Sequence, residues 1–303
     1  MKKKSSLRLR RNEIIQSYLM IAPSVLGLGL FVIYPILWVL RYALFSFSGI
    51  GEPFYVGFEN FERLFVNSPR YWQAVGNTFV FAFGKLAIEL PLALVCATLL
   101  YRGLKGRSFF RMTFFLPSML SIAVMGIMFY YLFGSYNGVV NEIIMAFGGS
   151  RVAFFSEPRL AMGVIMIASV WENFGINMLF FMAGLQSIPY ELYEASAIDG
   201  ANRRDQFMRI TLPMLGPVMQ MVILNALLGS LKVAELIIVM TEGRPDGTTQ
   251  MMMSYVFRQF FPAQSTSSAN YGYGSVLVIM SAIILGIVTA IYLRSTRRSA
   301  DII

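Results

Sequence analysis

The sequence has no histidine, a single cysteine and few charged residues, and each shortage excludes a class of chemistry. Without histidine there is no Ser–His or Cys–His catalytic couple and no histidine-based zinc motif. Cys96 lies inside an apolar run, so the chain has neither a disulfide framework nor a cysteine-rich metal site. No metal-binding spacing of carboxylates and no G-x-x-x-x-G-K-[ST] phosphate-binding motif occurs. We therefore predict no catalytic residue, no bound metal and no cofactor in this chain.

Apolar residues are abundant instead. They make up 56% of the 303 residues against 14% charged residues, and the mean hydropathy is +0.62. These values are typical of a polytopic membrane protein. Six stretches hold the roughly 20 apolar residues that a membrane-spanning helix needs. They are 18–45, 75–100, 109–133, 160–185, 214–240 and 274–293. The fold class predicted is an all-α membrane protein with six transmembrane helices.

Positive charges are distributed unequally between the segments that join these spans. If the N-terminus is cytoplasmic, the inside segments carry sixteen Lys and Arg residues and the outside segments carry six. The inside set is Lys2, Lys3, Lys4, Arg8, Arg10, Arg11, Arg102, Lys105, Arg107, Arg111, Arg203, Arg204, Arg209, Arg294, Arg297 and Arg298. The outside set is Arg63, Arg70, Arg151, Arg159, Arg244 and Arg258. Because cytoplasmic loops carry the excess of basic residues, we predict that both termini are cytoplasmic.

A basic segment, 1–17, precedes the first apolar run, 18–47. That run is longer than the apolar part of a cleavable signal peptide, about 7–15 residues, so we predict a retained transmembrane helix. The topology rule and anionic lipid explain the basic residues better than nucleic acid does. We therefore expect membrane lipid, and no nucleic acid, as a partner. The rest of the chain divides into a core transmembrane domain, 75–294, and a cytoplasmic tail, 295–303.

Several charged and polar residues fall inside the predicted spans. A charge there costs about 2.5–3.5 kcal/mol on insertion scales, so each needs a partner or a polar cavity. Lys85 with Glu89, and Lys232 with Glu235, have the spacing of pairs on one helix face. The candidate polar pathway in spans four and five consists of Trp171, Glu172, Asn177, Asn225 and Ser230. The alternative is that such side chains only lock neighbouring helices together.

The segment 187–213 between spans four and five has helix signals of its own. Pro189 fits the first turn of a helix, and Gly200 can adopt the left-handed conformation that ends one. Asn202 is a suitable N-cap for a second helix, with Asp205 three residues later as in a capping box. Pro213 opens the next apolar run. We predict a short helix, a tight turn and a second short helix.

The spacing of residues in this segment resembles the EAA motif of permease subunits in binding-protein-dependent ABC importers. The motif reads E-A-A, three residues, G, nine residues, I, one residue and L-P, and every spacing is kept here. The matching residues are Glu194, Ala195, Ser196, Gly200, Ile210, Leu212 and Pro213. The one departure is Ser196 at the third position, where the motif has alanine. Serine is small and still allows close packing.

Other stretches are similar to the carbohydrate-uptake group of these permeases, which includes the maltodextrin and glycerol-phosphate permeases. The similar stretches are Trp171 with 184–189, 199–201, 230–235, and 56–61 with 77–78. Segment 241–245 is similar to the group's T-x-G-G-P sequence, with Arg244 in place of the second glycine. The resemblance extends over most of the chain from about Tyr18 onward.

This resemblance implies a type I ABC importer permease fold and a mechanism. Two permease subunits, here expected to be a heterodimer, form the pore in a bacterial or archaeal inner membrane. Two ATPase subunits hold ATP–Mg and dock from the cytoplasm, and an extracytoplasmic binding protein delivers a sugar. The short helix of the EAA loop sits in a cleft on the ATPase and transmits its closure to the spans. The implied coupling residues are Glu194, Ala195, Ser196, Asp199, Gly200, Ile210, Leu212 and Pro213.

Two other classes of function remain as alternatives. An ion-coupled secondary transporter would use the intramembrane charges, would work from this chain alone and would usually show inverted repeats. No convincing repeat is found. A membrane scaffold or an intramembrane enzyme is the third class, and the missing nucleophile–base sets disfavour the enzyme. If ATP energises transport, another chain must supply the ATPase.

Overall fold

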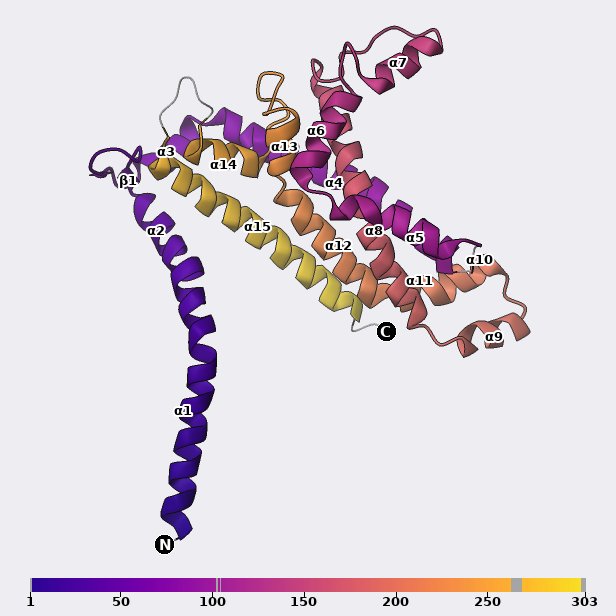
Figure 1. Ribbon diagram of the computed structural model, residues 1–303, viewed down its shortest axis with the longest axis horizontal. Helices are drawn as coiled ribbons and strands as arrows, with labels where there is room; N and C mark the ends of the chain where they lie inside the picture. Colours follow the sequence, from indigo (N-terminus) through magenta and orange to yellow (C-terminus); the bar gives the residue numbers. More distant parts are fainter. Residues whose placement is uncertain (1, 102, 104, 263–268, 301–303) are drawn as a thin grey trace. The chain divides into compact units, whose positions relative to one another are not determined.

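The computed structural model describes residues 2–101, 103, 105–262 and 269–300 (Figure 1). Arg102 and the predicted tail beyond residue 300 lie outside the described residues. The described structure is helical apart from turns, loops and two short antiparallel strands, β1 (Phe45–Ser46) and β2 (Phe54–Tyr55). This confirms the all-α class. The chain divides into two compact units, Met1–Asn67 with Gln259–Met280, and Ser68–Arg258 with Ser281–Ile303.

The first unit begins with one long helix, apolar from Ile14 onward, made of α1 (Lys2–Leu28), the π-helical turn η1 (Gly29–Ile33) and α2 (Tyr34–Tyr42). The π turn ends two residues before Pro35, which has no N–H to donate and whose ring would clash in a regular helix. The stretch Ile14–Tyr42 is long and apolar enough to span a membrane, and none of its apolar window is buried in the protein. The helix ends before the predicted boundary at residue 45, because the chain turns into β1.

Polar and aromatic contacts hold the rest of the first unit. The side-chain amide of Asn60, in α3 (Glu59–Val66), donates hydrogen bonds to the backbone oxygens of Ala43 (3.1 Å) and Phe45 (3.0 Å). The guanidinium of Arg63 lies 4.3 Å from the ring centroid of Tyr273, near the start of α15 (Tyr271–Ala300). These contacts fix α3 against the end of α2 and the beginning of α15.

The second unit is built around α4 (Pro69–Tyr101) and α8 (Pro158–Gln186), which pack against each other. One buried cluster includes Phe81, Ile165 and Ile237, and a second includes Met178 and Leu215. α8 also passes very close to α5 (Arg107–Phe115): a Cβ added at Gly175 would overlap the backbone carbonyl of Phe114. A glycine at this position allows the two helix backbones to approach.

Two of the predicted spans are bent rather than straight. Four helices of the described chain are long and apolar enough to cross a membrane, or up to six if each bent helix pair forms one span. The third predicted span consists of two helices, 107–119 and α6 (Ile122–Leu132), with an angle of 99° between them. The first of these helices ends in the 3-10 turn η2 (Leu116–Met119). Pro117 lies in that turn, and Pro217 lies at the start of α12 (Gly216–Leu231), where the helix 203–214 bends by 67° into the fifth span. Both prolines remove a helical hydrogen bond at the bend.

Two asparagines organise the connecting segments of the second unit. Asn141, in α7 (Val139–Ala146), is fully buried, donates to the backbone oxygens of Gly134 (3.0 Å) and Val152 (2.9 Å), and accepts from Val152 N. Asn77 donates to the backbone oxygens of Thr248 (2.8 Å) and Gln250 (3.0 Å), just before α14 (Met252–Phe260). Each loop is therefore fixed by one buried or half-buried amide.

Candidate functional site

The predicted short helix in segment 187–213 is present as α9 (Glu191–Ile198). Gly200 has a φ of +83°, so it adopts the left-handed conformation predicted for it. Gly200 N donates to Ala197 O (3.1 Å) and Ala201 N donates to Ser196 O (2.9 Å). This pair of bonds is a Schellman motif, which satisfies carbonyls at the end of the helix. The sequence therefore specifies where α9 stops.

The second helix begins directly after this turn and is longer than predicted. The side-chain oxygen of Asn202 accepts from Arg204 N (2.9 Å) and Asp205 N (3.0 Å), which confirms it as the N-cap. The helix then runs without interruption through α10 (Arg203–Gln206), the π-helical η3 (Phe207–Thr211) and α11 (Leu212–Met214). It ends at the bend into α12, so α9 is joined to the fifth span by a continuous helix and one bend.

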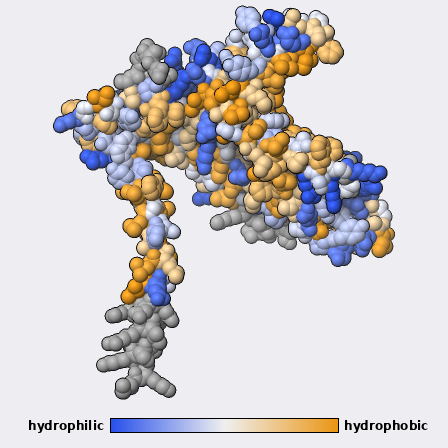
Figure 2. Space-filling view, viewed as in Figure 1, coloured by the Kyte–Doolittle hydropathy of each residue, from blue (hydrophilic) through white to orange (hydrophobic). Residues whose placement is uncertain are grey.

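The outer side of α9 is not covered by the described part of the chain. Glu194, Ala195, Asp199 and Gly200 are exposed, and the apolar side chain of Ile198 is 88% exposed. Hydrophilic side chains gather where α9 and α10 lie (Figures 1 and 2). The outer side of α9 therefore carries charged side chains and one exposed apolar side chain, and it is accessible to a partner.

The remaining residues of the motif lie on the inner side of the segment or at its end. Ile210 packs against the buried cluster that contains Met178 and Leu215. Leu212 is half-buried, and Pro213 is exposed within α11. These positions connect α9 to the helical core, whereas the exposed Glu194 lines an open cavity between α9 and the helix that follows it.

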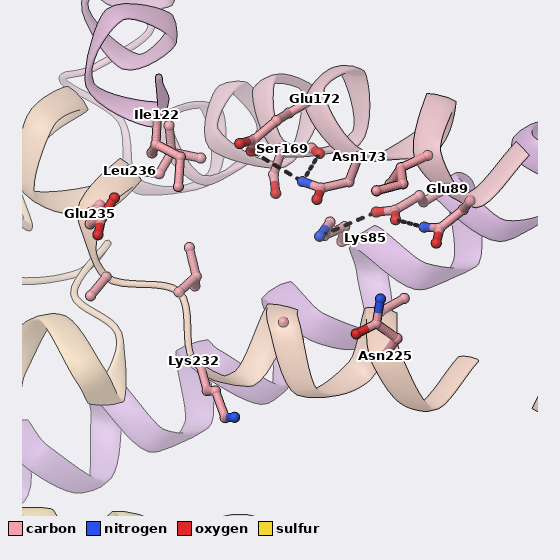
Figure 3. A pocket seen from close by; sticks show the side chains of 16 residues that line it. Lys85, Glu89, Ile122, Ser169, Glu172, Asn173, Asn225, Lys232, Glu235 and Leu236 are labelled. Atoms are coloured by element: carbon pink, nitrogen blue, oxygen red, sulfur yellow. Dashed lines mark hydrogen bonds and ion pairs between the residues drawn. The ribbon is translucent and has the colours of Figure 1, made fainter. Parts of the chain in front are cut away.

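A polar cavity of about 410 Å³ lies inside the second unit, between α4, α8, α12 and α13 (Glu235–Met240) (Figure 3). Its polar lining consists of Lys85, Glu89, Ser169, Glu172, Asn173, Asn177, Asn225, Lys232 and Glu235. Of the residues predicted for the polar pathway, Glu172, Asn177 and Asn225 line this cavity. Four helices, with Lys232 at the end of α12, therefore bring together residues that are distant in the sequence.

Lys85 and Glu89 form the ion pair predicted from their spacing. The Lys85 ammonium lies 3.2 Å from Glu89 Oε2, and the two side chains are only 5% and 0% exposed. The amide of Asn177, on α8, donates to the other oxygen, Glu89 Oε1. Oε2 has no hydrogen bond apart from this ion pair. One buried carboxylate thus joins α4 to α8.

Trp171 and Ser230 are not among the residues that line the cavity. The Trp171 ring lies 5.6 Å from that of Phe129, against the cluster around Phe81. The Ser230 hydroxyl is buried and donates to Ala226 O (2.7 Å) within its own helix. Both side chains therefore contribute to packing behind the cavity wall.

The prediction that Lys232 and Glu235 pair on one helix face is wrong. The fifth span is interrupted between Leu231 and Glu235, so the two residues no longer share a helix face. No ion pair joins them, and Lys232 extends away from Glu235 (Figure 3). Glu235 instead lines the cavity.

Ser169 and Asn173 line the cavity but were not among the predicted pathway residues. Asn173 donates to Ser169 O (2.9 Å) and to the Glu172 carboxylate (3.1 Å). Ser169, Asn173 and Asn177 are spaced four residues apart, which places them on one face of α8. The four-residue spacing of these polar residues is the feature of the sequence that could have identified Ser169 and Asn173 as lining the cavity.

Apolar helices of spanning length, a polar cavity between them and an exposed helix between two spans define a membrane transport protein. The family model for the binding-protein-dependent transport system inner membrane component matches residues 89–300. The chain belongs to this family. It is therefore an inner membrane component of a binding-protein-dependent transport system.

Curated relatives agree with this assignment over nearly the whole chain. The arabinooligosaccharides transport system permease protein AraP of Bacillus subtilis is 33% identical over 91% of this chain and 87% of its own length. The trehalose/maltose transport system permease protein MalF of Thermococcus litoralis is 30% identical over 97% of this chain and 98% of its own. The probable ABC transporter permease protein YesP of Bacillus subtilis is 31% identical, covering 98% of this chain and 94% of that protein.

A solved structure shares the fold. A chain from the crystal structure of a bacterial ABC transporter involved in the import of the acidic polysaccharide alginate matches with a TM-score of 0.83 and 23% sequence identity. The match covers 97% of this chain and 99% of that chain. The fold predicted from the EAA resemblance, that of an ABC importer permease, is thereby confirmed.

Proposed function

We propose that this chain is one of two pore-forming permease subunits of an ATP-driven importer for a sugar. The observation that carries the proposal is α9, an exposed helix whose C-terminal end is fixed by a Schellman motif and which is joined by a continuous helix to the fifth span. The importer is proposed to contain two ATPase subunits, which hold ATP–Mg. One of them receives α9 of this chain from the cytoplasmic side. A second, different permease subunit completes the pore, and both termini of this chain lie in the cytoplasm.

The coupling role is proposed for the residues of the EAA motif. Glu194, Ala195, Asp199 and Gly200 form the exposed side or the end of α9 and are available to contact the ATPase. The inward-facing Ile210 would transmit movement of the segment to the core, since it packs on the cluster around Leu215. Leu212 and Pro213 lie just before the bend into α12.

The proposed substrate is a sugar, either an oligosaccharide or a sugar derivative, delivered by an extracytoplasmic binding protein. The names of the relatives describe transport of arabinooligosaccharides and of trehalose or maltose. The amides and carboxylates of Glu172, Asn177 and Asn225 in the cavity are groups that can hydrogen-bond to sugar hydroxyls. Trp171 and Ser230 are proposed to shape the wall behind them. An ion-coupled transporter is disfavoured by the family to which the chain belongs.

Co-purification from the native host tests whether α9 binds an ATPase. Gly200→Pro should destroy the Schellman turn, because proline fixes φ near −65° whereas Gly200 needs +83°. We expect the wild-type chain in mild detergent to retain an ATPase and a second permease, and Gly200→Pro to keep the permease but lose the ATPase. Mass spectrometry identifies the partners.

Gly148→Pro is the matched control. Gly148 has a φ of +81° and ends α7 with the same pair of hydrogen bonds, Gly148 N to Met145 O and Gly149 N to Ile144 O. The control variant should therefore suffer the same local damage and still retain the ATPase. An ATPase that stays bound to Gly200→Pro, or that never accompanies the wild-type chain, would contradict the proposed coupling role.

A further inference from the structure

Two side chains on the inner side of α9 and two on the helix that follows form a connected set of hydrogen bonds. The Gln206 amide nitrogen donates to Ser196 Oγ (3.0 Å) and to Tyr193 O (3.2 Å). Ser196 Oγ donates to Tyr193 O (2.9 Å). The Tyr193 hydroxyl lies 2.9 Å from Thr211 Oγ1, which also lies 3.4 Å from Gln206 O. Tyr193 and Ser196 lie on α9, and Gln206 and Thr211 lie on the helix through η3.

The donors and acceptors of this set agree with one another. A backbone carbonyl only accepts, so the Gln206 nitrogen must face Tyr193 O, and this orientation also presents a proton to Ser196 Oγ. Ser196 then uses its own proton on Tyr193 O. The proton of each hydroxyl has an acceptor, so every donor in the set can be satisfied at the same time.

The π-helical turn η3 explains how two residues five positions apart both reach α9. In a regular α-helix with 3.6 residues per turn, Gln206 and Thr211 would point in clearly different directions. Hydrogen bonding from residue i to i+5 widens the turn and brings such residues onto nearly the same side. η3 covers Phe207–Thr211, and Leu212 N bonds to Phe207 O. The widened turn therefore lies where both polar contacts to α9 are made.

We propose that Ser196 and Gln206, supported by Tyr193 and Thr211, form a polar latch that makes α9 and the helix 203–214 move as one body. This inference deepens the proposed coupling function and rests on it. On its C-terminal side α9 is joined to α12 through the turn at Gly200 and the bend at Leu215, and a hinge at the turn would absorb movement passed from α9 to α12. The hydrogen bonds of the latch prevent bending at this turn, so a movement of α9 is passed on to α12.

The latch gives Ser196 a positive role at the position where the motif has alanine. Alanine has no acceptor for the Gln206 amide, so an alanine in this chain would leave Gln206 with only the Tyr193 carbonyl. Serine and Gln206 therefore act as a pair, and Ser196 is a positioning residue rather than an ATPase contact.

The test measures the distance between α9 and α12 with two nitroxide labels in the full-length chain in lipid nanodiscs. Cys96 is replaced by serine, and the labels are attached to Glu191→Cys on α9 and Met221→Cys on α12, both at exposed positions. Distance distributions are recorded by pulsed electron paramagnetic resonance for the chain alone and for the ATPase-bound complex trapped with ATP and vanadate.

We expect one narrow distance distribution in the wild-type background, unchanged by ATP and vanadate. In Gln206→Leu the ratio of chains at the wild-type distance to chains at all other distances should fall about fivefold. This is the change expected from the loss of roughly one net hydrogen bond. Ser196→Ala should have a smaller effect, and should add little in the Gln206→Leu background, because the two residues share one interaction. Gln73→Leu makes the same change at an exposed position on α4 and should leave the distribution as in wild type.

Two results would overturn the latch. One is a Gln206→Leu distribution as narrow as that of wild type, and the other is an equal effect of Ser196→Ala with and without Gln206. The labelled chain alone supplies these results, so they do not depend on a partner. Failure of the ATPase to co-purify with wild type would instead contradict the coupling function itself, and the two outcomes are therefore distinguishable.

Discussion

The buried ion pair of Lys85 and Glu89 gives the sharpest energetic prediction. Removing one partner leaves the other charge buried without compensation, whereas removing both leaves an apolar site of similar volume. We therefore compare Lys85→Met, Glu89→Leu and the double variant. Asn177 donates to Glu89 and is kept in all three variants.

The expected magnitude follows from burial. The two side chains are 5% and 0% exposed, so solvent screens the pair little. Each single variant should lose about 3–5 kcal/mol of stability, the usual cost of breaking a buried pair. The double variant should recover most of this loss. The part that is not recovered comes from Asn177, whose amide loses its acceptor, at about 1–3 kcal/mol.

The assay is thermal unfolding of the purified chain in one detergent, followed by tryptophan fluorescence and by loss of the monodisperse peak in size-exclusion chromatography. Each single variant should lower the unfolding temperature by at least about 5 °C, and the double variant by clearly less. Single variants as stable as wild type would mean that the charges are not buried as described. A double variant as damaged as the sum of the singles would refute the reasoning that the pair compensates itself.

Three smaller changes, the first with a matched control, test other contacts. Gly175→Ala should destabilise the chain by about 1–3 kcal/mol, because its Cβ meets the backbone of Phe114, which cannot move aside. Gly163→Ala on the same helix has open space around it and should be neutral or stabilising in the same melting assay. Asn202→Ala removes the N-cap and should cost about 1 kcal/mol, seen as faster amide exchange in the segment after α9 while the rest of the chain is unchanged. Asn141→Ala leaves backbone groups of a buried loop unpaired, so limited proteolysis should cut between α6 and α8 several-fold faster than in wild type.

The sequence was most informative where structure depends on neighbouring residues. α9, the left-handed Gly200 and the Asn202 cap were predicted correctly, because a glycine at a helix end and an asparagine before the next helix act locally. The Lys85–Glu89 pair was also predicted, since residues four apart on one helix must be neighbours.

Features that depend on contacts between helices were not predicted. The 99° bend in the third span and the interruption after Leu231 look like continuous apolar runs in the sequence. The interruption is why the expected Lys232–Glu235 pair does not form. Likewise, hydropathy could not tell that Trp171 and Ser230 face packed neighbours whereas Asn225 faces the cavity. Composition tells which residues are polar, but not which side of a bent helix faces the cavity.

Site-directed cross-linking in native membranes tests the central claim, contact between α9 and an ATPase, most directly. In a Cys96→Ser background, a photoactivatable cross-linker is attached to Ile198→Cys or to Phe147→Cys, which are 88% and 90% exposed in the wild-type chain. Ile198 ends α9, whereas Phe147 follows α7 on the side predicted to be outside. The account predicts a cross-link from position 198 to an ATPase subunit and none from position 147. A position 198 label that reaches no ATPase, or reaches it no more often than position 147, would contradict it.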